Sequence, residues 1–179
     1  MKTRPFAQSV TGLLGTKAAD EYVILSPTTP GPDGDYFPTV YNSMPYQELA
    51  VLEAFWKTRH LVNVDDDRVY LTGYSLGGHA TWHHAGVRPH LFAAAIAMAG
   101  VPHFRGFPYS IIHYVPNYRN LPFMAIWGEL DRKDPTRLGQ PDLCRLATEE
   151  MKRRGCALYR GIELKEKGHA GCYPEAGRM

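Results

Sequence analysis

Apolar and polar residues alternate in blocks along the chain, in the order expected of strands and helices that follow one another. Five short apolar runs, each bounded by turn-forming residues, predict strands buried in a sheet. The run 92–99 also fits a helix by composition, but its length and the glycine after it favour a strand. The five predicted strands are 22–25, 68–72, 92–99, 122–127 and 157–164.

Between these runs, apolar residues recur at three- and four-residue spacing, which predicts helices with one buried face. The first helix should begin near Pro45, a residue suited to a first helical turn. The others should span 76–86 and 141–154, the last ending at Gly155 in a left-handed cap. Residues expected to be buried are Leu49, Leu52 and Trp56 on the first helix, and Leu143, Leu146, Ala147 and Met151 on the last.

Alternation of strands and helices predicts an α/β fold with a mostly parallel sheet and helices on both of its faces. The 179 residues are enough for one domain with its own core, spanning 1–179. Ligands of such sheets bind beyond the carboxyl ends of the strands. Catalytic residues should therefore lie in the loops that follow strands.

The first such loop holds the pattern Gly-x-Ser-x-Gly around Ser75, between a predicted strand and a predicted helix. In that context the pattern indicates a strained turn that exposes a nucleophilic hydroxyl, rather than a small residue in an ordinary turn. Gly73 and Gly77 meet the demand for small neighbours, and Gly78 would let the helix lie close to the sheet. The backbone N–H of Leu76 could face a developing oxyanion.

Two later loops supply an acid and a base. Asp131, which follows the strand 122–127, is the favoured acid, with Asp134 as second choice and a solvated acidic loop as the alternative. His169 lies between glycines after the last predicted strand, where the backbone has room to reach across a site. The chain order Ser75, Asp131, His169 is the order of nucleophile, acid and base in α/β-hydrolases.

The histidines of the helix after Ser75 are better explained as packing or surface residues, and the cysteines as reduced, partly buried thiols. The histidines of the helix after Ser75 have no suitably spaced acidic partner, so no metal site is expected. The cysteines lack Cys-x-x-Cys spacing and are odd in number, which favours reduced thiols over disulfides or zinc. These residues are His79, His83 and His84, and Cys144, Cys156 and Cys172.

With these motifs the chain resembles an α/β-hydrolase of the branch that holds polyhydroxybutyrate depolymerases, feruloyl esterases and prolyl oligopeptidases. The matching segments are 22–27, 65–78, 121–131 and 167–169. The resemblance implies Ser75 as nucleophile, Asp131 as acid and His169 as base. It also implies that neither a metal nor an organic cofactor is needed.

The chain departs from this family's pattern at both ends. Family members usually carry an earlier strand ending in a His-Gly loop that gives a second oxyanion donor, and nothing similar precedes residue 22. A closing helix would also be expected after His169, where only ten residues remain. We therefore expect a fragment of a longer hydrolase domain, with self-association through an exposed sheet edge.

The expected substrate is a small ester or a peptide, because the same Ser-Asp-His chemistry serves both. Aromatic residues in 101–118 should either overhang the site or cover the core. The residues expected to bind substrate are Tyr74, His103, Phe104 and Tyr109. A peptidase and a non-catalytic binding domain are the alternatives to an esterase.

Composition excludes other classes of function. A net charge of +2 without a dense basic block argues against nucleic-acid binding. No run approaches the roughly 18 apolar residues of a membrane span. The N-terminus lacks the apolar core of a signal peptide, which predicts a cytoplasmic protein if Met1 is the true start.

Overall fold

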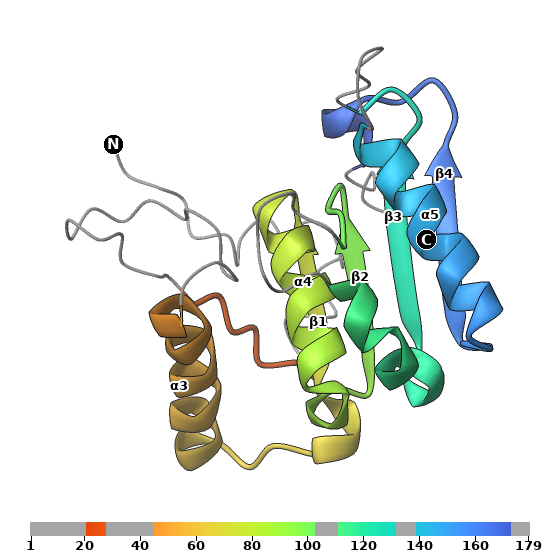
Figure 1. Cartoon of the computed structure of the whole chain (residues 1–179). Coiled ribbons are helices and arrows are strands. Elements are labelled where there is room, and N and C mark those ends of the chain that lie inside the picture. Colours follow the sequence, from red (N-terminus) through yellow and green to blue (C-terminus); the bar gives the residue numbers. More distant parts are fainter. Residues whose placement is uncertain (1–20, 28–44, 103–110, 132–138, 173–179) are drawn as a thin grey trace.

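The computed structural model describes residues 21–27, 45–102, 111–131 and 139–172 (Figure 1). Its centre is a sheet of four parallel strands whose order in the sheet is their order along the chain. Each strand lies within two residues of a predicted run, which confirms four of the five predictions. The strands are β1 (Tyr70–Tyr74), β2 (Ala94–Met98), β3 (Phe123–Gly128) and β4 (Tyr159–Leu164).

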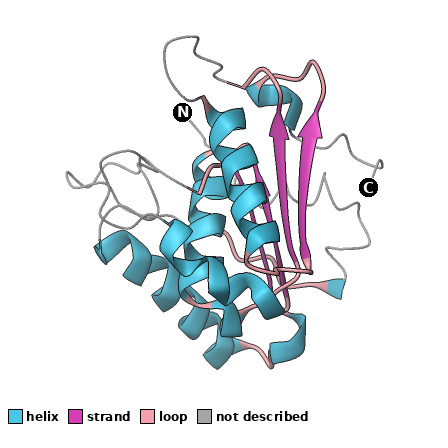
Figure 2. Cartoon of the chain, turned by 45° about the vertical axis from the view of Figure 1, so that its right-hand side comes forward, coloured by secondary structure: helices cyan, strands magenta, loops and turns pink. Residues whose placement is uncertain are grey.

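Helices connect the strands, as the predicted alternation requires. In Figure 2, α4, η3 and α5 lie on the same side of the sheet, where α4 packs on β1 and β2 and α5 on β3 and β4. None of the described helices is both long enough and apolar enough to span a bilayer. The α-helices are α3 (Pro45–Leu61), α4 (Leu76–Val87) and α5 (Gln140–Arg153). The 3-10 helices are η1 (Asp66–Arg68), η2 (Pro89–Leu91), η3 (Ile111–Asn120) and η4 (His169–Cys172).

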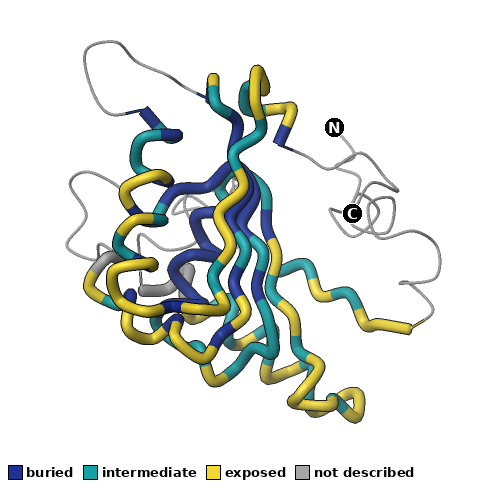
Figure 3. Tube along the Cα trace, turned by 90° about the vertical axis from the view of Figure 1, so that its right-hand side faces the viewer, coloured by how far each residue is buried: buried dark blue, intermediate teal, exposed yellow. Residues whose placement is uncertain are grey.

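The hydrophobic core lies between the sheet and the helices that cover it. Trp82 of α4 packs against Phe123 of β3, with ring centroids 4.5 Å apart. Tyr118 of η3 closes on Phe123 at 4.9 Å and donates its hydroxyl proton to the Trp82 carbonyl. Figure 3 shows that the buried parts of the chain gather at the centre of the molecule and that exposed parts surround them. The strand residues buried in this core come from β2 and β3.

Helix α5 buries most of the face that the sequence predicts. Ala147 and Met151 are buried, as expected, but Leu146 is largely exposed and Cys144 is buried in its place. Positions 144, 147 and 151 share one helical stripe by their spacing of three and four, and position 146 lies off it. The predicted left-handed cap at Gly155 is confirmed by its φ of 72°.

Helix α3 begins at Pro45 as predicted, but the burial expected on it is wrong. Leu49 and Trp56 are exposed, at 62% and 48%, and Leu52 is only partly buried. The physical reason is that none of the other described elements packs extensively on α3. Instead, the Arg59 guanidinium lies over the Trp56 ring, 5.4 Å from its centroid.

Residues 22–25 do not form the predicted strand. They follow an irregular path, and Val23 is 68% exposed. Tyr22 contacts the edge of the sheet through its side chain, with its ring edge-on to Tyr70 and its hydroxyl accepting a hydrogen bond from Arg68. Among the described strands none pairs with this segment, so its backbone makes no ladder; Tyr22, Val23 and Leu25 are exposed.

Candidate active site

Ser75 occupies the strained turn that its sequence pattern predicts. It joins β1 directly to α4, with φ 57° and ψ −115°, a backbone region that side chains other than glycine rarely adopt. The turn is bound to β2, because the Ser75 N–H donates to the Met98 carbonyl at 2.9 Å. It is also bound to α4, because the His79 N–H donates to the Ser75 carbonyl at 3.0 Å. The surrounding structure thus fixes a conformation that is costly by itself.

Two of the three neighbouring glycines are required by space. A Cβ at Gly73 would lie 2.2 Å from the Gly77 carbonyl oxygen, and one at Gly78 would lie 2.4 Å from the Met98 oxygen. Gly78 therefore lets α4 lie close to β2, as predicted. A Cβ at Gly77 would meet nothing within 4 Å, so the expectation that Gly77 must itself be small is wrong. What crowds Gly73 is the backbone of residue 77, which any amino acid would supply.

Asp131 follows β3 in a turn tied to the loop after β4. The Asp131 N–H donates to the Gly128 carbonyl at 3.2 Å, and the Leu130 N–H donates to the Lys167 carbonyl at 2.9 Å. The two loops approach so closely that a Cβ at Gly128 would lie 2.3 Å from the Lys167 carbonyl oxygen. The absence of a side chain at position 128 therefore helps to bring the acid loop against the histidine loop.

The neighbouring carboxylate of Glu129 strengthens this connection between the loops. It accepts hydrogen bonds from the Glu166 N–H and the Lys165 ammonium, both at the end of β4. These two donors, the backbone N–H first, lower the pKa of Glu129. Glu129 thus holds the loops together at a partly buried position, whereas Asp131 is fully buried. Asp134, the second choice from sequence, lies outside the described residues.

The structure brings Ser75, Asp131 and His169 into one hydrogen-bonded row. His169 Nε2 lies 2.8 Å from Ser75 Oγ. On the other side of the ring, Nδ1 lies 2.9 Å from Asp131 Oδ1 and 2.8 Å from Oδ2. The carboxylate is inaccessible while the imidazole is 30% exposed, so the row runs from the interior to the surface. A carboxylate so placed favours the tautomer with a proton on Nδ1, which leaves Nε2 able to accept the serine proton.

The expected oxyanion donor and substrate residues are only partly placed. Leu76 is the first residue of α4, and N–H groups of a first turn have no partner within their helix. Tyr74 lies beside the row and donates its hydroxyl proton to the His169 carbonyl at 2.8 Å. His103, Phe104 and Tyr109 lie outside the described residues.

Two aromatic residues from the same stretch belong to the core. Tyr118 of η3 is fully buried, and Tyr114 of the same helix is partly buried against the core cluster. For these two residues, the structure supports the alternative in which the aromatics of 101–118 cover the core. Burial raises the pKa of the Tyr118 hydroxyl well above its ordinary value.

The three histidines of α4 and the three cysteines are buried in the interior. His79 bonds through Nδ1 to the backbone of Val101, whose N–H donates at 2.8 Å. The described residues hold no group of three side chains that could bind a metal ion. All three cysteines are free and buried, and burial raises the pKa of Cys172 to about 11. The buried histidines are His79, His83 and His84.

Two features of the site could not be assigned from the sequence. Gly128 reads as an ordinary glycine in a turn, and the backbone that it faces is some forty positions away. Tyr74 reads as a substrate contact, because sequence spacing does not reveal that its hydroxyl meets the His169 carbonyl. Both depend on how the loop after β4 folds back over β3. The only signal in the sequence was that both residues lie where a strand ends.

The chain is similar to known proteins in part of its sequence and in its fold. A model of the prolyl oligopeptidase family matches residues 45–124, which include the Ser75 turn. A thermostable esterase is similar in structure, with a TM-score of 0.55 and 26% identity, over 72% of this chain and 31% of the esterase. A comparison of the sequence with curated proteins finds no match.

Two further solved structures share the fold at lower identity. A ferulic acid esterase has a TM-score of 0.53 at 15% identity, over 75% of this chain and 59% of its own. The siderophore hydrolase EstB from Aspergillus nidulans has a TM-score of 0.51 at 20% identity, over 80% of this chain and 57% of its own. The chain thus spans between about a third and three fifths of the length of these three structures.

Proposed function

From this chain's membership of the α/β-hydrolase superfamily, we propose that it is a serine hydrolase that cleaves carboxylic esters through an acyl-enzyme on Ser75. The observation that carries the proposal is the hydrogen-bonded row of Ser75, His169 and Asp131 at the carboxyl ends of β1, β3 and β4. Three residues far apart in sequence would not form this row by local structure. Such a row is the arrangement that activates a serine hydroxyl.

Acylation of the serine is the first half of the proposed reaction. Ser75 Oγ attacks the ester carbonyl carbon while its proton passes to His169 Nε2 over the 2.8 Å contact. In the proposed step, Asp131 stabilises the imidazolium that forms, and the Leu76 N–H donates to the oxyanion. The tetrahedral intermediate then collapses, and the alcohol leaves with the proton from His169. The acyl group remains bound to Ser75 through a new ester.

Deacylation repeats these steps with water in place of the serine. His169 takes a proton from a water molecule while the water oxygen attacks the acyl carbon. Collapse of the second intermediate releases the carboxylic acid and returns the proton to Ser75 Oγ. Each proton taken by His169 is thus given back, and the scheme uses only water and groups of this chain.

A peptidase of the prolyl oligopeptidase type is the second candidate. The observation that favours it is the match of that family's model to residues 45–124. The triad chemistry is the same for esters and amides, so the substrate must separate the two. The residues that we expect to contact substrate include His103, Phe104 and Tyr109, and these assignments remain predictions.

The experiment is a comparison of two substrates on the purified chain. We expect turnover of a short p-nitrophenyl ester and slower or no turnover of a p-nitroanilide that follows proline. Faster cleavage of the anilide would favour the peptidase instead. Ser75→Ala should lose activity on either substrate by about 10³-fold or more. A wild-type chain that melts cooperatively yet hydrolyses neither substrate would contradict the proposal and favour a non-catalytic binding domain.

A further inference from the structure

The side chain of Tyr74 links the serine turn to the histidine loop. Tyr74 is the last residue of β1 and directly precedes Ser75. Its hydroxyl donates to the His169 backbone carbonyl at 2.8 Å, and its ring lies 5.3 Å from the imidazole, tilted by 48°. His169 is therefore contacted by Tyr74 at its backbone and at its ring face, in addition to the bonds that its two nitrogens make.

The histidine loop needs such support. Gly168 precedes His169 and has no side chain to pack, and a Cβ there would meet nothing within 4 Å, so the backbone at this position is held by hydrogen bonds such as that from the Gly171 N–H to the Gly168 carbonyl at 3.1 Å. Residues 165–167, 170 and 171 are exposed. A rotation of this backbone by a few degrees would move the imidazole away from Ser75 Oγ, and misplacement of reacting groups is costly in rate.

Tyr74 can supply that support because it is itself rigidly held. It pairs with Met98 in the parallel ladder of β1 and β2. Its neighbour Ser75 is anchored to the Met98 carbonyl by a separate hydrogen bond. Tyr74 and Ser75 are therefore both fixed to β2 through Met98. The hydrogen bond from the Tyr74 hydroxyl then fixes the backbone of His169 relative to Ser75.

We infer that Tyr74 is a positioning residue, which holds His169 by its main chain so that Nε2 stays within proton-transfer distance of Ser75 Oγ. This inference rests on the proposed function, and it replaces the substrate-binding role expected from the sequence. A positioning role predicts an effect on kcat, because the tyrosine acts through His169. A substrate contact would act mainly on KM.

The test compares Tyr74→Phe with the wild type on a p-nitrophenyl ester. The variant keeps the ring and removes only the hydrogen bond to the His169 carbonyl. We expect kcat to fall about three- to tenfold, the usual effect of one hydrogen bond, with KM unchanged within twofold. Tyr159→Phe is the matched control, because it removes a hydroxyl bonded to Thr148 in the core, and it should retain wild-type kcat.

A proton NMR spectrum gives a second readout that does not depend on turnover. The Nδ1 proton between His169 and Asp131 should give a downfield signal, broadened by exchange in Tyr74→Phe and unchanged in Tyr159→Phe. An unchanged signal with unchanged kcat, or a raised KM with wild-type kcat, would overturn the inference. If the wild type itself is inactive, the proposed function fails, and the NMR comparison alone decides whether Tyr74 holds His169.

Discussion

The two sides of the molecule differ in how completely their apolar side chains are covered. Where α4 and η3 cover the sheet, Trp82, Phe123 and Tyr118 are almost inaccessible to solvent. Around α3 and residues 21–27, side chains of the same apolar kind, such as Trp56 and Val23, are exposed. The two sides have the same kinds of apolar side chain. They differ in whether other described elements pack on those side chains.

Among the described residues, the contacts that hold Ser75, Asp131 and His169 together come from the covered side. Ser75, Asp131 and His169 all follow strands of the covered sheet, and each loop is held by contacts from within residues 69–172. Of the described strands, β1 pairs only with β2, and Tyr70 at its far edge is half exposed. Self-association through this edge, expected from the sequence, therefore remains a proposal for the uncovered side.

The largest difference in stability should be seen between two tryptophan-to-alanine variants, one on each side of the molecule. Trp82→Ala deletes a buried ring that packs on Tyr118, Phe123 and Tyr159, and should lower the free energy of unfolding by about 3–5 kcal/mol. Trp56→Ala removes an exposed ring and should cost less than about 1 kcal/mol. Urea unfolding followed by circular dichroism measures both. Similar losses in the two variants would show that α3 is packed as tightly as α4.

A smaller effect separates two adjacent glycines at the start of α4. A Cβ at Gly78 would collide with β2, so Gly78→Ala should lose about 1–3 kcal/mol of stability and also ester turnover, because α4 and the Ser75 turn must shift. Gly77→Ala has open space and gains helix propensity, so its stability should be unchanged or raised by up to about 1 kcal/mol. Thermal melts of both variants make the comparison. Equal destabilisation would contradict the close approach of α4 to β2.

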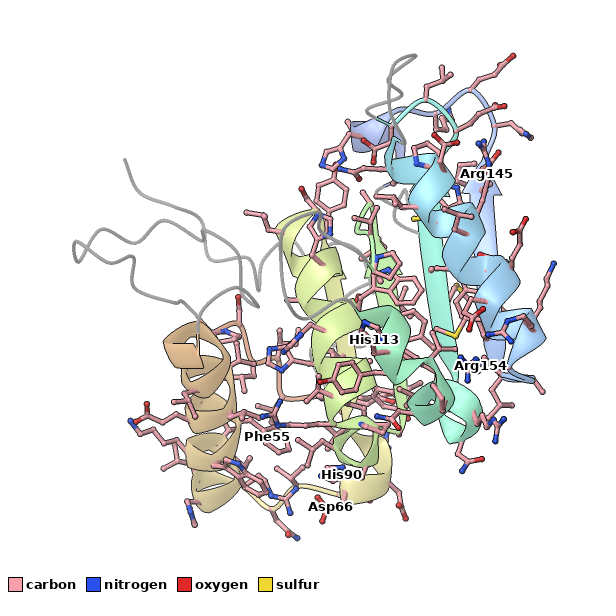
Figure 4. The ribbon with its side chains drawn as sticks, in the orientation of Figure 1. Phe55, Asp66, His90, His113, Arg145 and Arg154 are labelled. Atoms are coloured by element: carbon pink, nitrogen blue, oxygen red, sulfur yellow. The ribbon has the colours of Figure 1, made fainter. Side chains whose placement is uncertain are left out.

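The smallest effect concerns two ion-paired glutamates. Glu163 of β4 accepts a hydrogen bond from Arg145 of α5, labelled in Figure 4, and this bond is the main cause that lowers its pKa to about 2. On α3, Glu53 pairs with Lys57 in full exposure, and that pairing lowers its pKa as well. The first pair should stabilise the fold and the second should contribute little, because water screens exposed charges.

The pH dependence makes this comparison sharper. A lowered pKa in the folded state means that the stabilisation is present above the unfolded value, near 4.5, and is lost as pH falls toward 2. Glu163→Gln should therefore be about 1 kcal/mol less stable than the wild type at pH 7, and the difference should disappear as pH falls through about 2. Glu53→Gln should match the wild type throughout. A constant difference for Glu163→Gln at every pH would contradict an electrostatic origin.

The sequence predicted the elements wherever local pattern decides them. Strands β1 to β4 and helices α4 and α5 follow from apolar runs and turn residues, and Ser75 takes its strained backbone from its place between strand and helix. Because parallel strands bring their carboxyl ends to one edge, the loops of Asp131 and His169 could also be expected to meet that of Ser75.

Burial and long-range contacts could not be read in the same way. The periodicity of α3 is that of a helix with a buried face, but whether the face is covered depends on what lies beside it. The same holds for residues 22–25. Their apolar composition suits a strand, but none of the described strands pairs with them. Tyr74 and Gly128 act on backbone atoms of distant loops, which no local pattern encodes.

Labelling with a fluorophosphonate probe tests the central proposal most directly, because the probe reacts with a serine only where the hydroxyl is activated. We predict that the wild type is labelled at Ser75, as mapped by mass spectrometry of its peptides. Ser26→Ala, a control that removes another serine, should be labelled equally, and Ser75→Ala should not be labelled. A folded wild type that resists the probe, or a Ser75→Ala variant labelled as fast as the wild type, would contradict an activated serine at position 75.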